Sequence, residues 1–343
     1  MEINRRHAAA AILAWVVVYG VFVALAGPTE FVDDVTNISG PRLAVMMVLN
    51  LLGTVTMGLV LYTVGRRVGL GISAVESILL NATISLASNL TPFGQASGLP
   101  IGGAIISRWT GERFEKGLAA LSIKEVAGFT PAILVFVFGG GYIALYDPTV
   151  PSRVRSLIAA FSISVTVLVA VAVGVYRNPD TTQRLVRRLV TALNRGLVYI
   201  PRVSKLDETE IRGRVDSFAA SVGDITSDPR TLVAAGALTT GRVVAQGLLL
   251  WVTLAGVGVS VPLVVAVFVI PVSLLASALP LPGGSGGIEG APILLLLGMA
   301  GGSESGVLAG VAVSRGLVFW TPIVAGSLTL AGIQVRRRLA TGG

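Results

Sequence analysis

The chain has 343 residues, of which 53% are hydrophobic and only 13% are charged, with a mean hydropathy of +0.81. Soluble proteins carry about 25% charged residues, so this composition excludes a mainly soluble protein. The absence of cysteine and the single histidine exclude disulfides, iron–sulfur clusters and metal centres built from histidine clusters.

The apolar runs predict an all-α, polytopic transmembrane helical bundle of about eight spans. Several runs reach the roughly 20 residues that cross a bilayer as a helix. They are apolar all round, whereas the strands of a membrane barrel alternate between polar and apolar residues. In chain order the predicted spans are Ala8–Gly27, Leu43–Val64, Gly71–Leu90, Glu125–Tyr146, Val154–Tyr176, Thr231–Leu254, Pro262–Leu279 and Ser305–Val335.

Basic residues next to the spans predict the topology. Arginines occupy positions 5–6, 66–67 and 336–338, and the net charge is +8. The positive-inside rule then places both termini in the cytoplasm of a multi-pass protein, for which we expect the plasma membrane. The first apolar run is longer than that of a signal peptide, so it is expected to stay as a helix. The acidic segment 27–41 is expected to be an external loop, and nucleic acid is not an expected partner.

Two apolar stretches are interrupted by glycine and proline. PFGQASGLPIGGAII covers Pro92–Ile106, and LPGGSGGIEG, from Leu281, is followed by a short apolar piece, Pro292–Ala300. Unpaired backbone groups are costly in lipid, so such segments persist only where protein or a cavity covers them. We predict re-entrant or half-helix segments near 92–107 and 281–302. Their unwound amides at bilayer depth would receive an anionic headgroup, since paired interruptions indicate a transporter's midplane site.

The longest polar segment, 177–230, contains ten Lys/Arg and seven Asp/Glu and is predicted to lie in the cytoplasm. Leucines at four-residue spacing in 185–197, with arginines on the other side, predict a basic amphipathic helix that lies on the inner leaflet or connects two halves. Asp228-Pro229 then predicts the start of the next helix. The expected organisation is a first membrane half (1–176), this connector (177–230) and a second membrane half (231–343).

Charged residues inside the apolar runs are the first candidates for a site. A charge at the bilayer centre costs at least about 2.5–3.5 kcal/mol, so it usually faces the bundle interior and is paired. We predict that Arg242 and Arg315 contact a phosphate or carboxylate, with Glu125 and Glu289 as counter-ions. Purely structural salt bridges are an equally good interpretation.

Two further charges lie near predicted span ends. Glu76 and Lys124 are close enough to those ends to extend toward the interface. The PGGSGG glycines at 282–287 lack the GK[ST] ending of a P-loop, and only their position between apolar runs, followed by Glu289, favours a site.

The segment LPLPGGSGGIEGAPILLLL resembles the signature of the membrane region of lysylphosphatidylglycerol synthases, a flippase-like family. SRGLVFWTP around Arg315 is similar to that family's last helix, and Asn89–Gly94 with Arg108 and Lys124-Glu125 is similar to its first-half motif. The resemblance covers roughly residues 8–338 and implies a bundle with re-entrant elements that binds or moves a polar lipid. Gln95 and Ala96 depart from the pattern. The expected substrate-binding residues are Asn89, Pro92, Gln95, Arg108, Lys124, Glu125, Arg242, Gly283, Gly284, Gly286, Glu289 and Arg315.

The leading hypothesis is a flippase-like protein that binds or translocates an aminoacyl-phospholipid or a polyprenyl-phosphate-linked sugar. An ion-coupled carrier of small solutes and an accessory membrane subunit of a glycosyltransferase or lipid synthase are the alternatives. No catalytic residue, metal or cofactor is expected, and synthase activity is not carried over because the longest soluble segment has only about 54 residues. Membrane lipids are the expected partners, and a homodimer or a synthase partner stays open.

Overall fold

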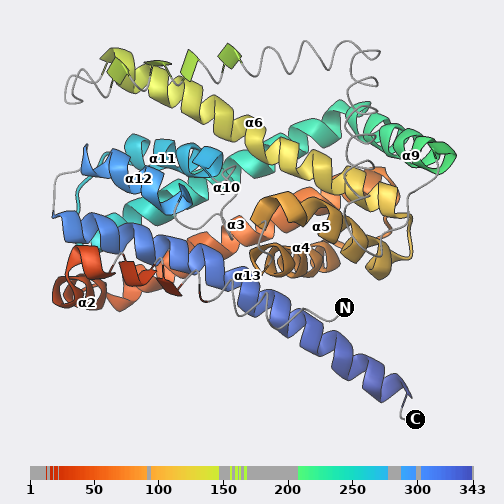
Figure 1. The fold of residues 1–343 in the computed structure, drawn as a ribbon, viewed down its shortest axis with the longest axis horizontal. Helices are drawn as coiled ribbons and strands as arrows, with labels where there is room; N and C mark the ends of the chain where they lie inside the picture. The colour runs from red at the N-terminus through yellow and green to blue at the C-terminus, as the bar shows by residue number, and fades with distance from the viewer. Residues whose placement is uncertain are drawn as a thin grey trace.

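The computed structural model describes residues 13–341 except for 91–93, 147–154, 168–207, 277–286, 299–302 and several positions within 14–22 and 157–165. The elements of this described part are ten α-helices (Figure 1). They are α2 (Pro28–Thr36), α3 (Gly40–Arg67), α4 (Ala74–Asn89), α5 (Gly94–Thr110), α6 (Phe114–Tyr146), α9 (Glu208–Thr226), α10 (Pro229–Gly256), α11 (Leu263–Ala276), α12 (Gly287–Leu297) and α13 (Glu304–Thr341).

Four of these helices are long and apolar enough to cross a membrane: α3, α6, α10 and α13. They correspond to four of the eight predicted spans, and α4 and α11 coincide with two more as shorter helices. The fold is therefore the predicted helical membrane bundle. Most of the predicted span Val154–Tyr176 and all of the predicted amphipathic helix lie outside the described residues.

Local sequence signals fix several helix starts. Ser73 and Glu76 form a capping box at the start of α4, in which each side chain accepts a hydrogen bond from the other residue's backbone N–H. The Asp228 carboxylate accepts a hydrogen bond from the backbone N–H of Arg230, and Pro229 takes the first position of α10. The predicted helix start at Asp228-Pro229 is confirmed.

The order of helices is repeated within the chain. In each unit a first helix (α2, α9) leads into a 28-residue helix (α3, α10) and then a helix of 16 or 14 residues (α4, α11). After a break come a helix of 17 or 11 residues (α5, α12) and a long final helix (α6, α13). Neighbours also correspond: α4 packs on α13 as α11 packs on α6, and α9 packs on α6 as α2 packs on α13. The described part thus contains two similar units, α2–α6 and α9–α13.

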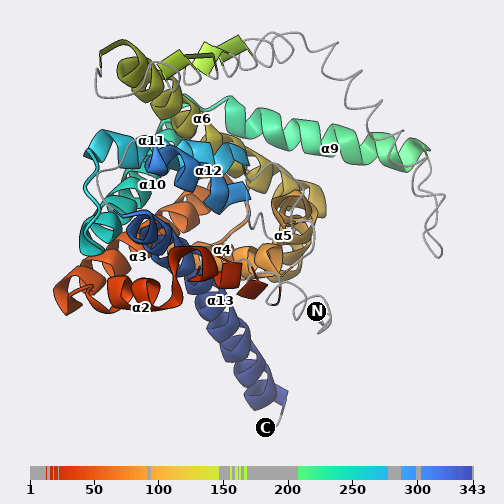
Figure 2. The same ribbon diagram turned by 60° about the vertical axis from the view of Figure 1, so that its left-hand side comes forward.

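The two units run in opposite directions and meet along α3 and α10. Gly256, at the end of α10, lies beside Ile38, just before α3, whereas Arg67, at the end of α3, donates a hydrogen bond to the carbonyl of Asp224, just before α10. Figures 1 and 2 show the same antiparallel arrangement, with α6 and α13 also running in opposite directions. Inverted repeats of this kind place a transporter's binding site at the interface between the units.

Two apolar clusters lie at opposite ends of this interface. The first joins the start of α3 to the end of α10, α11 and the start of α13, and includes Met46, Leu254 and Phe268. The second joins the end of α3 to α4, α5, α6 and α9, and includes Leu61 and Ile225. Their burial supplies the apolar packing on both sides of the centre.

Three sequence expectations about local structure are wrong. The expected loop 27–41 contains helix α2, which Gly27 at φ 86° and Pro28 begin. The helix α6 starts at Phe114 rather than near Glu125, so residues 124 and 125 lie in its interior. The backbone from Gly94 to Ile106, expected to be unwound, forms part of helix α5 despite Pro100, and its glycines let α5 pack closely on α4 and α6. The re-entrant or half-helix arrangement expected near 92–107 stays a prediction.

Candidate functional site

A cavity of about 550 Å³ lies where the two units meet. Six helices contribute most of its wall, and its volume falls in the range of roughly 300–1,000 Å³ that ligand pockets have. The polar and charged lining residues are Asn50, Thr54, Asn81, Ser85, Ser88, Asn89, Lys124, Glu125, Arg242, Gln246, Ser273, Ser314 and Arg315. Ionisable residues in a cavity between helices of span length mark a candidate binding site or pathway.

The charged residues of the cavity occupy positions that correspond between the two units, opposite another charge in one case and a glycine in the other. Glu125 is the twelfth residue of α6, counted from Phe114, and Arg315 is the twelfth of α13, counted from Glu304. Gly53 of α3 and Arg242 of α10 are likewise both the fourteenth residue of their helices. A Cβ on Gly53 would lie 3.9 Å from Cγ of Arg242, so the glycine leaves room for the arginine stem.

The predicted pair of Arg315 and Glu289 is formed. Nε of Arg315 donates a hydrogen bond to Oε1 of Glu289 over 3.4 Å, and the side chain of Glu289 is only 3% exposed. The side chain of Arg315 is 23% exposed and lines the cavity. One turn before Arg315, the carbonyl of Ala312 accepts a hydrogen bond from the hydroxyl of Tyr19. This bond holds the residues around Tyr19, which precede α2, against this part of α13.

Lys124 does not extend to the interface as predicted. Its side chain is 5% exposed, donates a hydrogen bond to Oδ1 of Asn81 over 3.0 Å and pairs with Oε1 of Glu125 over 2.8 Å. The prediction was wrong because it started the helix at residue 125, whereas α6 begins three turns earlier. Glu125 is 41% exposed into the space that it lines.

Arg242 makes no direct contact with Glu125, its predicted counter-ion. Within the part of the chain that the structure describes, no hydrogen bond or ion pair holds its guanidinium. Its main electrostatic interactions are attraction to Glu125 and repulsion from Arg315. Glu125, its predicted counter-ion, is in direct contact with Lys124 instead. Arg242 is thus the cavity cation available to an anion.

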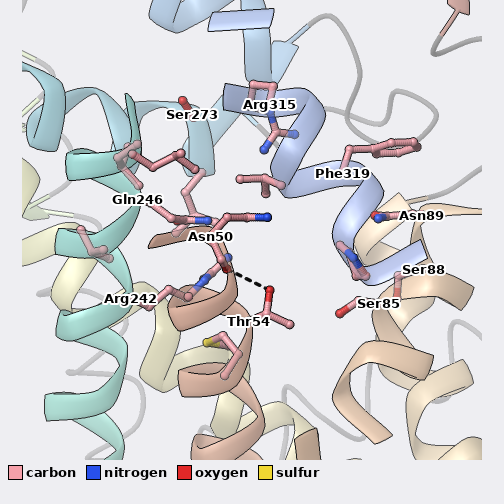
Figure 3. A pocket seen from close by; sticks show the side chains of 18 of the residues that line it. Asn50, Thr54, Ser85, Ser88, Asn89, Arg242, Gln246, Ser273, Arg315 and Phe319 are labelled. Atoms are coloured by element: carbon pink, nitrogen blue, oxygen red, sulfur yellow. Dashed lines mark hydrogen bonds between the residues drawn. The ribbon is translucent and has the colours of Figure 1, made fainter. Parts of the chain in front are cut away.

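The opposite wall of the cavity is polar but uncharged. Asn81, Ser85, Ser88 and Asn89 follow one face of α4 at helical spacing and all line the cavity. Figure 3 shows Ser85, Ser88 and Asn89 on one side of the space, with Arg242 and Gln246 across it and Arg315 above. Except for Asn89, sequence reasoning missed these residues. Their spacing of three and four in an apolar span was the available signal.

Asn50 connects the two units at the centre. It lies in α3, and its Nδ2 donates hydrogen bonds to the carbonyl of Leu317 and the hydroxyl of Thr321. These residues precede Pro322, whose missing N–H interrupts the helical bonding of α13. The Asn50 side chain therefore links α3 to α13 in the turn just before Pro322.

The structure brings together five of the predicted residues in the cavity wall: Asn89, Lys124, Glu125, Arg242 and Arg315. Glu289 lies behind them as the partner of Arg315. Arg108 is exposed in the last turn of α5 and does not line the cavity, so its proposed site role is not supported by its position. Pro92, Gly283, Gly284 and Gly286 lie outside the described residues, as does the side chain of Gln95. No group of three or more His, Asp or Glu residues in the described ranges could hold a metal ion.

The fold and the cavity define a polytopic helical membrane protein whose two inverted units enclose a charged, partly solvent-accessible site. Residues 8–326 match the lysylphosphatidylglycerol synthase TM region, and the chain belongs to this family of lipid-related membrane proteins. A comparison with curated proteins finds no match.

Proposed function

We propose that this protein moves the polar headgroup of a membrane lipid between leaflets by alternating access to the cavity. One observation carries the proposal: the charged cavity lies at the junction of two inverted units. Rocking of such units about their interface opens a central site to one side of the membrane and then to the other. The family match supports a lipid as the cargo. The role is transport rather than catalysis.

The proposed orientation puts both termini and α9 on the cytoplasmic side of the plasma membrane. Arg66, Arg67 and Arg113 lie at the α9 end of the bundle, where Arg113 donates to Ser217 and Arg67 to the Asp224 carbonyl. Because the chain has no cysteine, single cysteines report on each side. A membrane-impermeant maleimide should label Gly40→Cys in intact cells and Gly213→Cys only after lysis. Both glycines are exposed and have open space at their Cβ position.

Lipid movement is tested in proteoliposomes. Fluorescent lipids with anionic, zwitterionic and cationic headgroups are reconstituted with the purified protein, and the fraction accessible to a membrane-impermeant reductant is followed in time. Wild-type protein should accelerate exchange of at least one lipid above the rate in protein-free vesicles.

A cavity-filling variant links that exchange to the site. Ser85→Trp places a large ring in the cavity and should return exchange to background, whereas Val233→Trp, 71% exposed on the outer face of α10, should retain it. Equal rates with and without protein for every lipid would remove the proposal, and uptake of a water-soluble solute would favour a small-solute carrier. Unchanged exchange in Ser85→Trp would place the pathway elsewhere.

A further inference from the structure

The charges around the cavity do not cancel. Lys124, Arg242 and Arg315 are cations, whereas Glu125 and Glu289 are the carboxylates that face them, which leaves one positive charge. This balance is that of the residues that the structure describes.

The two carboxylates are already occupied. Glu125 contacts Lys124 at 2.8 Å, and Glu289 contacts Arg315 at 3.4 Å with almost no exposed surface. A cationic headgroup could reach only the exposed part of Glu125, whose carboxylate already contacts Lys124, and it would lie beside the positive charge of Arg242. An anionic phosphate meets Arg242, whose guanidinium is attracted to Glu125 but makes no hydrogen bond or ion pair within the described residues. Low-dielectric surroundings strengthen both the repulsion of a cationic headgroup and the attraction of an anionic phosphate.

The wall facing Arg242 adds a second selection. This wall presents uncharged hydroxyl and amide groups from Ser85, Ser88 and Asn89 of α4, across the cavity from Arg242 (Figure 3). Hydroxyls and amides both donate and accept, which matches the hydroxyl groups of a glycerol, inositol or sugar. The ammonium of Lys124 does meet this face of α4 at Asn81, but it is also paired with the carboxylate of Glu125.

We infer that the cavity selects a lipid phosphodiester with an uncharged polyhydroxyl headgroup, the phosphate at Arg242 and the hydroxyls against the polar face of α4. This inference rests on the proposed function and narrows its cargo. It disfavours an aminoacylated, net-cationic lipid. It also predicts that opposite walls recognise the two features of the headgroup: Arg242 binds the charge, and the polar face of α4 binds the hydroxyls.

The test uses three lipids that separate these two properties. Phosphatidylglycerol has a phosphodiester and two hydroxyls, phosphatidylmethanol has the phosphodiester alone, and lysyl-phosphatidylglycerol carries a net positive charge. Binding to purified full-length protein is measured for each by native mass spectrometry, with soluble glycerophosphoglycerol as a lipid-free probe. We expect phosphatidylglycerol to bind most tightly, phosphatidylmethanol less tightly and lysyl-phosphatidylglycerol least.

Variants assign each preference to a wall. Arg242→Gln should weaken binding of both anionic lipids by about 10- to 100-fold, the size expected for losing a hydrogen bond to a charged group. Arg230→Gln, on an exposed position of the same helix, should have no effect. The double variant Ser85→Ala, Asn89→Ala should weaken phosphatidylglycerol but not phosphatidylmethanol. Thermal unfolding of each variant separates lost binding from lost folding.

The outcomes distinguish this inference from the proposed function. Tighter binding of the lysyl lipid, or equal binding of all three, overturns the inference while lipid exchange in vesicles can stand. Equal binding of the two anionic lipids overturns the polyhydroxyl part. If glycerophosphoglycerol binds as tightly as phosphatidylglycerol, the inferred headgroup chemistry is supported. The lipid chains then contribute nothing to binding, and the proposed lipid transport is contradicted.

Discussion

Replacing Arg315 by methionine tests the buried ion pair most directly. The substitution keeps an unbranched apolar stem but removes the cation that contacts the carboxylate of Glu289, which is 3% exposed. Breaking a buried ion pair by removing one partner costs roughly 3–5 kcal/mol, because the remaining charge loses its compensation in a low-dielectric site. We expect a destabilisation of that size.

The two partners are not equivalent. In Glu289→Leu the remaining Arg315 is 23% exposed toward the cavity, where water can solvate it, so we expect a smaller loss of about 1–2 kcal/mol. The double variant should resemble Glu289→Leu, because no carboxylate is then left unpaired.

Unfolding in mixed micelles, followed by the fluorescence of the four tryptophans, measures each free energy. The matched control is the exposed pair of Glu112 and Lys116, whose atoms are 2.8 Å apart and whose side chains are 35–36% exposed. Removing either partner there should cost no more than about 0.5 kcal/mol. Additive losses in the cycle of Arg315 and Glu289 would refute the reasoning.

Three further predictions concern stability, each measured from thermal unfolding of purified variants. Gly58→Ala should destabilise the bundle by about 1–3 kcal/mol, because its Cβ would come within 2.5 Å of the backbone of Ile78; Gly236→Ala, with open space, should be neutral or slightly stabilising. Asn50→Leu should cost about 1–3 kcal/mol by removing the hydrogen bonds to α13, and no loss would mean that they contribute little. A threonine hydroxyl bonded to Asp228 lowers the pKa of this carboxyl, so its capping contribution is present at neutral pH and is lost as the pH falls below about 4; Asp228→Asn should lack this pH dependence.

Composition and periodicity were sufficient to predict the fold class, since apolar runs of span length leave few alternatives in lipid. Helix starts with strong capping signals, such as Asp228, were also predictable. The α5 segment was not, because glycine and proline usually disfavour helix, and close packing outweighs that preference here. Gly98 faces Ser88, and Gly103 faces Leu118 and Phe114, contacts that only small residues permit and that sequence alone does not display.

The site was predictable where charge was the signal. Arg315 and Glu289 were paired correctly because both stand out in apolar surroundings. Lys124 was misassigned because its surroundings depend on geometry: a helix start displaced by eleven residues, from 125 to 114, moved it from an interface position to a buried one. Arg242 is attracted to its predicted counter-ion, Glu125, without contacting it. The inverted repeat was also hidden, since it lies in the order and lengths of helices and not in residue identities.

The two apolar clusters have a consequence for the cell's electrical insulation. The cavity borders Leu249 and Leu250 of one cluster and Ile84 and Leu121 of the other, so hydrocarbon-like packing stands at each end of the polar space. Within the described residues, an ion that leaves the cavity along the bundle axis meets apolar packing at either end, which is costly to enter. For the proposed lipid transport, such packing would limit the leak of ions while a headgroup occupies the cavity.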